Sequence, residues 1–336
     1  MQNEKKPHPR SVFENFELKE KEDDAIPLTP ALSLGERETH NPALGTKRNC
    51  GLAEDWRTIL PLPQGEGRGE GKATVRHPNT LQASIDSAIA RSFVYRFLAR
   101  AFEDPEEQGW WWIGSTETRQ ALWTGVKTLT NPALEAAAFT FASRLTPEAF
   151  ESFAGDYLAA FGHTVRGDCP LNEIEYGDIK ADPLFQPHRL ADLGAFYRAF
   201  GVEVAEDAAE RHDHICLELE FMSVLTAKEA YALEHQLDGE PLELCRDAQK
   251  KFLREHLGRW TPAFTRRLAR IVGNGALGAL ANFTRTFVEV ECARFGLAPG
   301  SEDLLLRPVD ESGERLCDSC GITNLLPGAL TTNLPA

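Results

Sequence analysis

The apolar residues after Leu81 recur three or four positions apart, and this helical spacing returns in segment after segment almost to residue 300. In the first segment the recurring residues are Ile85, Ala88, Ile89, Phe93, Phe97, Leu98 and Phe102. Such spacing gathers apolar side chains on one face of a helix. Runs that alternate apolar and polar residues, which would predict strands, are scarce. The pattern therefore predicts an all-α fold.

Eight further segments have helical spacing, and Gly, Pro, Asn and Asp residues separate them. We expect helices at about 81–102, 116–129, 132–143, 147–161, 188–200, 208–235, 241–258, 261–273 and 276–295. Together they predict a single helical-bundle domain of about ten helices over residues 78–300. No fixed-period repeat suggests a solenoid.

Residues 1–77 differ in composition, because they are charged, rich in Pro and Gly, and without periodicity. A segment of this kind buries too little apolar surface to fold, so we expect a disordered N-terminal extension. Within it, residues 28–33 (LTPALS) and 65–70 (GEGRGE) can be encoded by DNA stretches that are reverse complements of each other. We hypothesise that these residues are a translated DNA repeat, which the nucleotide sequence would test. On this hypothesis the GEGRGEG run is not a phosphate-binding loop.

The formal net charge of the 336 residues is −15, from 36 Lys and Arg and 51 Asp and Glu. This acidic balance argues against a nucleic-acid partner and is compatible with a basic one. The N-terminus lacks a signal-like apolar region, and nowhere do eighteen apolar residues run together. We expect a cytoplasmic protein without a membrane span. The seven scattered cysteines fit reduced thiols.

Residues 211–222, RHDHICLELEFM, concentrate His, Cys and carboxylate side chains, which are the usual metal ligands. Their spacing argues against a metal site, because only His214 and Glu218 would share a helix face. No second His cluster completes a coordination shell, so we expect no metal and no cofactor. The alternative function is a helical HD-type metal-dependent phosphohydrolase using His212-Asp213, which would need ligands from other helices.

The same stretch also fits the start of a buried helix. Asp207 and Glu210 could form a capping box, and apolar residues from Ile215 onward cover two faces. Glu218 would then be desolvated and would need a partner, which His214 could provide from one turn earlier. We predict a buried polar pair between His214 and Glu218.

The segment Asp213-His214-Ile215, with residues 218–222 (ELEFM), resembles the D-H-x-x-x-E-L-x-F-M signature of the TorD/DmsD family, the maturation chaperones of molybdenum oxidoreductases. Residues 169–177, CPLNEIEYG, resemble the C-P-x-x-E-x-x-Y-G block of one branch of that family. This branch serves dimethyl sulfoxide reductase-type enzymes such as ethylbenzene dehydrogenase and selenate, chlorate or nitrate reductases. Residues 190–201, LADLGAFYRAFG, lie between the two blocks as in that branch. His212 stands where the family commonly has Pro, so we expect a looser start to the helix.

The resemblance implies a TorD-like helical chaperone and no enzyme. Such a chaperone binds the catalytic subunit of a molybdopterin oxidoreductase, often through its twin-arginine leader, until the client's molybdopterin guanine dinucleotide cofactor is in place. An acidic surface suits a leader that carries paired arginines beside an apolar run. By position, the resemblance makes Glu173, Tyr176, Asp213, His214 and Glu218 the client-binding candidates. The alternative for each is a scaffold role, which is favoured for Glu218.

Three features stay outside this assignment. Residues 301–336 form an irregular tail whose single CxxC, Cys317 and Cys320, is at most half of a metal site. The three tryptophans at 110–112 are expected to pack into the core, and the alternative is an exposed aromatic cluster that would suit a hydrophobic client. A homodimer is left open.

Overall fold

The computed structural model describes residues 78–162, 167–177, 185–204, 210–237 and 239–307. These residues form α1 (Pro78–Ala101), α2 (Glu107–Gly114), α3 (Thr116–Thr128), α4 (Pro132–Ala142), α5 (Phe150–Phe161), α6 (Phe185–Ala199), α7 (Ile215–Glu234), α8 (Glu240–Glu255), α9 (Leu257–Val272) and α10 (Ala276–Arg294). Two 3₁₀ turns, η2 (Pro147–Ala149) and η3 (Glu173–Glu175), join them. Between 78 and 307 the described segments contain two isolated bridges and no strand. The predicted all-α fold of about ten helices is confirmed; the predicted extension and CxxC lie outside the described residues.

Local capping explains where several helices begin. Ser115 Oγ accepts a hydrogen bond from Thr118 N at 3.1 Å before α3. Asn131 Oδ1 accepts from Leu134 N at 3.0 Å before α4, and Pro132 occupies the first turn, where its missing N–H costs nothing. The predicted start of this helix at residue 132 is therefore confirmed.

The helix boundaries around Pro262 differ from the prediction, which placed a break between residues 258 and 261. Instead α9 begins at Leu257 and contains Pro262. Proline cannot donate to the carbonyl four residues earlier, here that of Gly258. Gly300 N donates to this oxygen instead, at 2.9 Å. A Cβ on Gly300 would collide with Arg259 O, so this close approach of the two backbones requires glycine.

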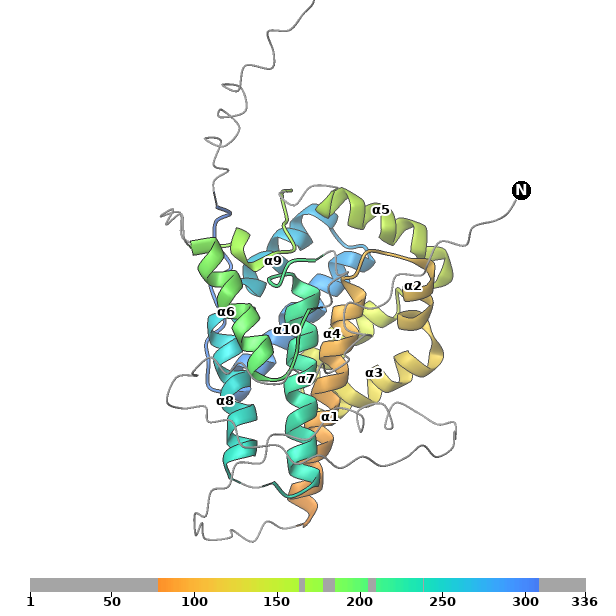
Figure 1. Ribbon diagram of the computed structural model, residues 1–336. Coiled ribbons are helices and arrows are strands. Elements are labelled where there is room, and N and C mark those ends of the chain that lie inside the picture. The colour runs from red at the N-terminus through yellow and green to blue at the C-terminus, as the bar shows by residue number, and fades with distance from the viewer. Residues whose placement is uncertain (1–77, 163–166, 178–184, 205–209, 238, 308–336) are drawn as a thin grey trace, which may run out of the picture.

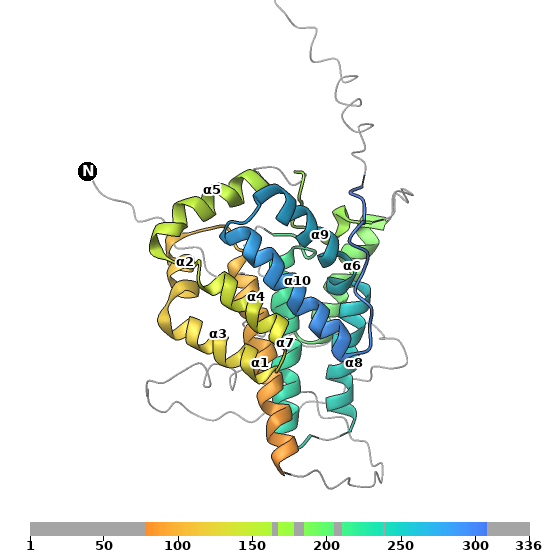
Figure 2. The ribbon, with the colours of Figure 1, turned by 180° about the vertical axis from the view of Figure 1, so that it is seen from behind.

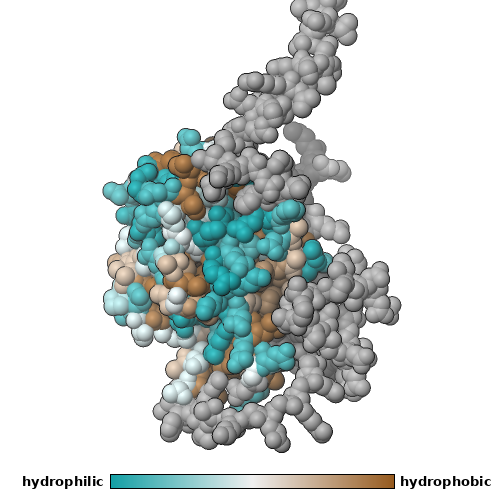
Figure 3. All heavy atoms as spheres, turned by 90° about the vertical axis from the view of Figure 1, so that its left-hand side faces the viewer, coloured by the Kyte–Doolittle hydropathy of each residue, from teal (hydrophilic) through white to brown (hydrophobic). Residues whose placement is uncertain are grey.

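At the centre of the bundle, α1 and α7 lie side by side over most of their length (Figures 1 and 2). Small residues allow this approach: Ser92 Oγ donates to Ser223 O at 2.9 Å across the pair. Helices α2 to α5 lie on one side of this pair and α6 and α8 on the other, and α9 and α10 cover the face that is turned toward the viewer in Figure 2. Figure 3 shows the side with α6 and α8, where hydrophilic residues cover most of the centre.

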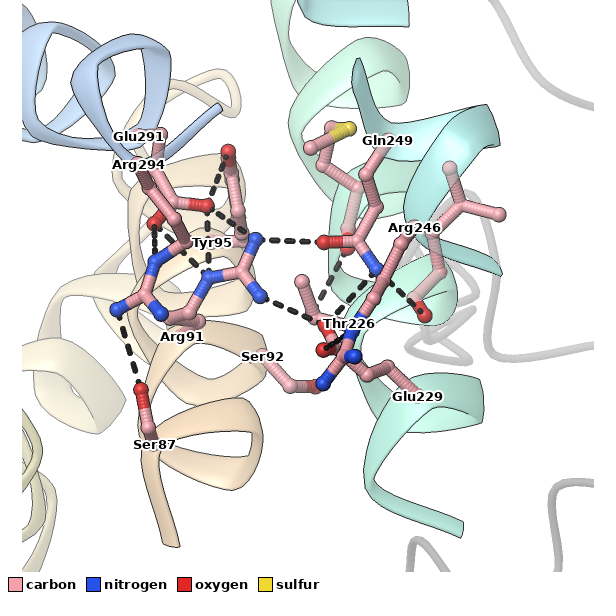
Figure 4. Close-up of polar contacts among 12 residues, drawn as sticks. Ser87, Arg91, Ser92, Tyr95, Thr226, Glu229, Arg246, Gln249, Glu291 and Arg294 are labelled. Atoms are coloured by element: carbon pink, nitrogen blue, oxygen red, sulfur yellow. Dashed lines mark hydrogen bonds and ion pairs between the residues drawn. The ribbon is translucent and has the colours of Figure 1, made fainter. Parts of the chain in front are cut away.

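A buried polar layer divides the apolar core in two. The main apolar cluster spans most of the bundle, and a smaller one lies where the start of α1 meets the end of α7 and the start of α8. Between them lie Arg91, Glu229, Gln249 and Glu291, each under a tenth exposed. Figure 4 shows these side chains linked by hydrogen bonds and ion pairs. Charges that must pair inside a core restrict how the helices can slide past one another.

Two sequence expectations can be compared with the described residues. Cys169, Cys216, Cys245 and Cys292 are free and buried, as expected for reduced thiols. None of the described helices is both long and apolar enough to cross a membrane.

Candidate functional site

The two sequence blocks at 169–177 and 211–218, about forty residues apart, come together in what we call the junction. Asn172 and His214 form an isolated antiparallel bridge. Glu173 N donates to Asp213 O, and Ile215 N donates to Leu171 O, both at 2.9 Å. The blocks are therefore one structural unit, held by backbone hydrogen bonds beside the start of α7.

Asp213 is fully buried, and both of its carboxylate oxygens accept hydrogen bonds within the junction. Arg211 donates to Oδ1 at 3.0 Å and to Oδ2 at 2.9 Å. Asn172 Nδ2 donates to Oδ1, and Ile174 N donates to Oδ2, both at 3.1 Å. Because a buried carboxylate needs such donors, Asp213 orders the turn that carries the first block.

Glu173 is the second buried carboxylate and connects the junction to α6 and α9. Its Oε2 lies 3.0 Å from His256 Nδ1, and its Oε1 accepts from Arg189 at 3.0 Å and from Arg259 at 2.9 Å. Burial opposes ionisation of this carboxyl. The hydrogen bond from His256 and the charges of His256, Arg259 and Arg189 nevertheless lower its pKa to about 2. Glu173 is thus an anion at neutral pH, surrounded by cationic groups.

Tyr176 anchors the other end of the first block inside the core. Its ring lies 5.1 Å from that of Trp260, between centroids, and its hydroxyl donates to Pro170 O at 2.8 Å. Burial raises its pKa well above 10, so it stays a neutral donor. Tyr176 therefore packs as a core residue.

Glu218 and His214 do not form the predicted pair. Glu218 Oε2 accepts from Trp260 Nε1 at 3.0 Å, and its Oε1 has no hydrogen-bond partner among the described residues. His214 is the N-cap of α7: its Nδ1 accepts from Cys216 N at 3.4 Å. The prediction was wrong because α7 begins at Ile215, later than the expected 208, which leaves His214 before the first turn.

Burial perturbs both of these groups. Burial and the negative charge of Glu173 raise the pKa of Glu218 well above 4.5, which favours the protonated form of its carboxyl. Burial also lowers the pKa of His214 to about 4, which keeps its ring neutral and able to accept as a cap. Of the proposed capping box, Asp207 lies outside the described residues, and Glu210 precedes α7 by five positions.

The tail of the domain closes over the junction. Gly177 N donates to Leu305 O at 3.1 Å, and Arg307 N donates to Glu175 O at 3.0 Å. Arg259 Nη1 also donates to Tyr176 O at 3.1 Å. No pattern in the sequence pointed to this contact, nor to Arg189, because single arginines on amphipathic helices usually face solvent.

Four of the five client-binding candidates, all but His214, are fully buried. The half-exposed groups of the junction are Arg189, Arg211, Arg259 and His212. The His212 ring stacks on Tyr197 at 6.1 Å, and Tyr197 Oη donates to His212 O at 2.7 Å. These contacts connect the turn before α7 to Tyr197 of α6, and the looser start of α7 stays a prediction.

The same geometry bears on the phosphohydrolase alternative. An HD-type centre needs His and Asp side chains that ligate a metal together. Both oxygens of Asp213 are already engaged by donors from its own chain. Over the described ranges, no group of three His, Cys, Asp or Glu side chains is placed to hold a metal ion. The carboxylate of this doublet is thus bound by hydrogen-bond donors of its own chain.

An apolar groove of about 390 Å³ lies away from the junction, between α3 and α4. Trp123, 40% exposed, and Phe139, 62% exposed, meet edge to face there at 6.2 Å. Arg119 lines the groove, and its Nε has no hydrogen-bond partner within the described residues. Of the tryptophans expected in the core, Trp110 is buried but Trp111 is 68% exposed. Large exposed apolar side chains of this kind mark interaction surfaces.

Comparison with known proteins defines the family. The family model described as "Nitrate reductase delta subunit" matches residues 127–266. The selenate reductase assembly chaperone protein of Thauera selenatis is 30% identical over 188 residues, which are 56% of this chain and 81% of that protein. The perchlorate reductase assembly chaperone protein of Dechloromonas aromatica is 29% identical, over 61% of this chain and 89% of that protein. Chaperone protein TorD of Vibrio cholerae is 33% identical over 34% of this chain and 51% of its own length.

The chain therefore belongs to this TorD-like family, as the two sequence blocks predicted. The matched relatives carry names of chaperones and not of enzymes. The comparisons thus favour the chaperone over the phosphohydrolase.

Proposed function

We propose that this protein is an assembly chaperone, without catalytic activity of its own, for the catalytic subunit of a molybdenum-dependent reductase. The observation that carries the proposal is the relationship to a selenate reductase assembly chaperone, which extends over 81% of that relative. The client, and not the chaperone, would carry the molybdopterin guanine dinucleotide cofactor. A maturation step of this kind takes place in the cytoplasm, before any export of the client.

We assign client recognition to two surfaces. The first is the outside of the junction built by Glu173, Tyr176, Asp213, His214 and Glu218. Because most of these side chains are buried, they would act by holding the half-exposed surface groups in place. His212 is the group of that surface which can be changed without breaking a buried ion pair.

The second surface is the groove between α3 and α4. Its exposed aromatic rings suit an apolar segment of an incompletely folded client. Binding of a twin-arginine leader is the finer part of the proposal: the apolar run of the leader would occupy the groove. The net charge of −15 would attract the paired arginines over a longer range.

Co-expression tests the proposed function. The tagged full chain is produced with the catalytic subunit of a molybdenum reductase from the same organism, once with and once without the subunit's leader. The subunit should co-purify with the chain and should contain more molybdenum than a subunit made alone. A subunit that reaches full molybdenum content without the chain, and is not captured by it, would overturn the chaperone assignment. Sedimentation of the complex would show whether one or two chaperone chains take part.

Matched variants test the two surfaces. Trp123→Ser combined with Phe139→Ser should reduce capture of the leader-bearing subunit, whereas Leu158→Ser, a similarly exposed residue of α5, should not. His212→Ala should also weaken capture, and His188→Ala, an exposed histidine of α6, serves as its control. If capture is unchanged in both tests while molybdenum loading still needs the chain, the surfaces are misassigned and the function stands.

A further inference from the structure

The polar layer between the two apolar clusters is an alternating chain of charges, Arg294–Glu291–Arg91–Glu229–Arg246, contributed by α1, α7, α8 and α10 (Figure 4). Arg91 lies at its centre and is 1% exposed. It donates to Glu291 Oε2 at 2.6 Å through Nη2 and to Glu229 Oε2 at 2.8 Å through Nη1. One guanidinium thus binds two carboxylates from different helices.

The carboxylate oxygens in this layer are all engaged. Glu229 Oε1 accepts from Arg246 Nε at 2.8 Å, and its Oε2 accepts from Gln249 Nε2 at 3.1 Å as well as from Arg91. Glu291 Oε2 accepts from Tyr95 Oη at 3.0 Å, and Arg294 Nε lies 3.5 Å from its Oε1. Three guanidiniums therefore face two carboxylates, which leaves one positive charge without a counterion within this set. An uncompensated charge in a partly buried site attracts an anion.

A polar cavity of about 250 Å³ adjoins this excess charge. The small residues Ala83, Ser84, Ser87 and Ala88 of α1 form one wall, and Arg91, Glu229, Arg246 and Arg294 complete the lining. Arg91 is buried, whereas the side chains of Arg246 and Arg294 are 39% and 37% exposed. The charge is thus buried on one side and accessible on the other.

Donors remain available around the cavity. Arg246 uses only Nε toward Glu229, so within the described part of the chain its two terminal nitrogens have no acceptor. Arg294 Nη2 donates to Ser87 Oγ at 3.1 Å. Because Ser87 accepts this bond, its own hydroxyl hydrogen is free to donate. Two forked guanidiniums and a hydroxyl match the several acceptor oxygens of one tetrahedral oxyanion.

We propose that this cavity is a binding site for a single phosphate group, held by Arg246, Arg294 and Ser87 above the buried Arg91. The group can belong to inorganic phosphate or to a larger phosphate-bearing ligand whose remainder extends through the exposed side. This site lies apart from the junction and the α3/α4 groove, and it does not depend on the proposed function.

Isothermal titration of the full chain with inorganic phosphate, at neutral pH and at ionic strength held constant with chloride, tests the proposal. Phosphate should bind saturably at one site. Arg246→Gln and Arg294→Gln should each weaken binding by about ten- to a hundred-fold, the range for loss of a charge-assisted hydrogen bond. Ser87→Ala, which leaves every ion pair intact, should weaken it less.

Arg285→Gln is the matched control, because Arg285 also lies on α10 and pairs with a glutamate four residues on, but does not line the cavity. It removes the same charge and should leave phosphate affinity unchanged. A second titration with pyrophosphate distinguishes the sources: tighter binding than phosphate indicates a diphosphate-bearing ligand, and equal binding indicates the single group. Absence of saturable binding at millimolar phosphate, or equal weakening by Arg285→Gln, would overturn the proposal.

Discussion

Glu173 and Glu218 are both fully buried carboxyl groups, and replacing each by glutamine should have opposite effects on stability. The pKa of Glu173 is lowered and cationic partners bind its carboxylate, whereas the pKa of Glu218 is raised. Glu173→Gln removes a paired charge and leaves Arg259, Arg189 and His256 without their anion. Glu218→Gln preserves a neutral group whose oxygen can still accept from Trp260.

The magnitude for Glu173 comes from its pKa. A fall from the ordinary 4.5 to about 2 corresponds to roughly 3 kcal/mol, at ~1.36 kcal/mol for each pH unit. Because the folded-state pKa is lowered, this stability is present above the unfolded-state pKa of 4.5 and is lost as the pH falls toward 2. Glu173→Gln should therefore lower the free energy of unfolding by roughly 3 kcal/mol at neutral pH. The difference from the wild type should shrink below pH 4.5.

The sign reverses for Glu218. Because its folded-state pKa is raised, its contribution is fully present below the unfolded-state pKa of 4.5 and is lost as the pH rises through the folded-state value. Glu218→Gln should therefore match the wild type in acid and gain stability relative to it as the pH rises.

Urea unfolding followed by circular dichroism, at a series of pH values from neutral down to about 3, measures both differences. Equal stability of Glu173→Gln and the wild type at neutral pH would refute the assignment of Glu173 as the paired anion. A large loss in Glu218→Gln at neutral pH would show that Glu218 is ionised and would refute the second half of the reasoning.

Three further predictions concern single positions, each measured by urea unfolding. His214→Ala should lower the free energy of unfolding by about 1 kcal/mol through loss of the α7 cap, and His214→Asn should keep the cap. Because the pKa of His214 is lowered to about 4, the wild type should lose stability as the pH falls from 6.5 toward 4. His214→Asn should not show this part of the loss, and an unchanged dependence of stability on pH would contradict the prediction. Gly300→Ala should lower the free energy of unfolding by about 1–3 kcal/mol, because the new Cβ meets the backbone of Arg259. Gly155→Ala, in open space within α5, should raise it by about 0.5–1 kcal/mol. Similar effects of the two substitutions would contradict the close approach of Gly300 to Arg259. Arg91→Met should lower the free energy of unfolding by about 3–5 kcal/mol, because two buried carboxylates each lose one cationic partner; a loss well below this range would contradict the central role of Arg91 in the polar layer.

Sequence periodicity was sufficient to predict the positions of the helices whose apolar faces are regular. The Asn131-Pro132 signal placed the start of α4, because cap and first-turn preferences depend on neighbouring residues alone. The short α2 was missed, since eight residues give too few turns to define a face. Pro262 misled the prediction of α9, because the carbonyl that it leaves without a donor is satisfied by Gly300, nearly forty residues away.

The sequence named residues of the junction but not their contacts, and the role of these residues in client binding stays a prediction. The two blocks contain Glu173 and Asp213, and both residues belong to the junction, where Glu173 N and Ile174 N donate to Asp213. The partners of Glu173 are Arg189 of α6, Arg259 of α9 and His256 between α8 and α9, and no pattern in these segments of the sequence pointed to them. The predicted His214–Glu218 pair failed because a shift of the helix start by several residues moves His214 out of the helix.

The sequence by itself determined the helical class of this protein, the core faces of its helices and, through two short blocks, its family. These properties depend on the local order of residue types along the chain. Only the tertiary structure decided which carboxyl groups are charged, because ionisation depends on burial and on partners distant in sequence. Glu173 and Glu218 have the same side chain and similar burial, and the neighbours that the fold brings to each lower the pKa of the first and raise the pKa of the second.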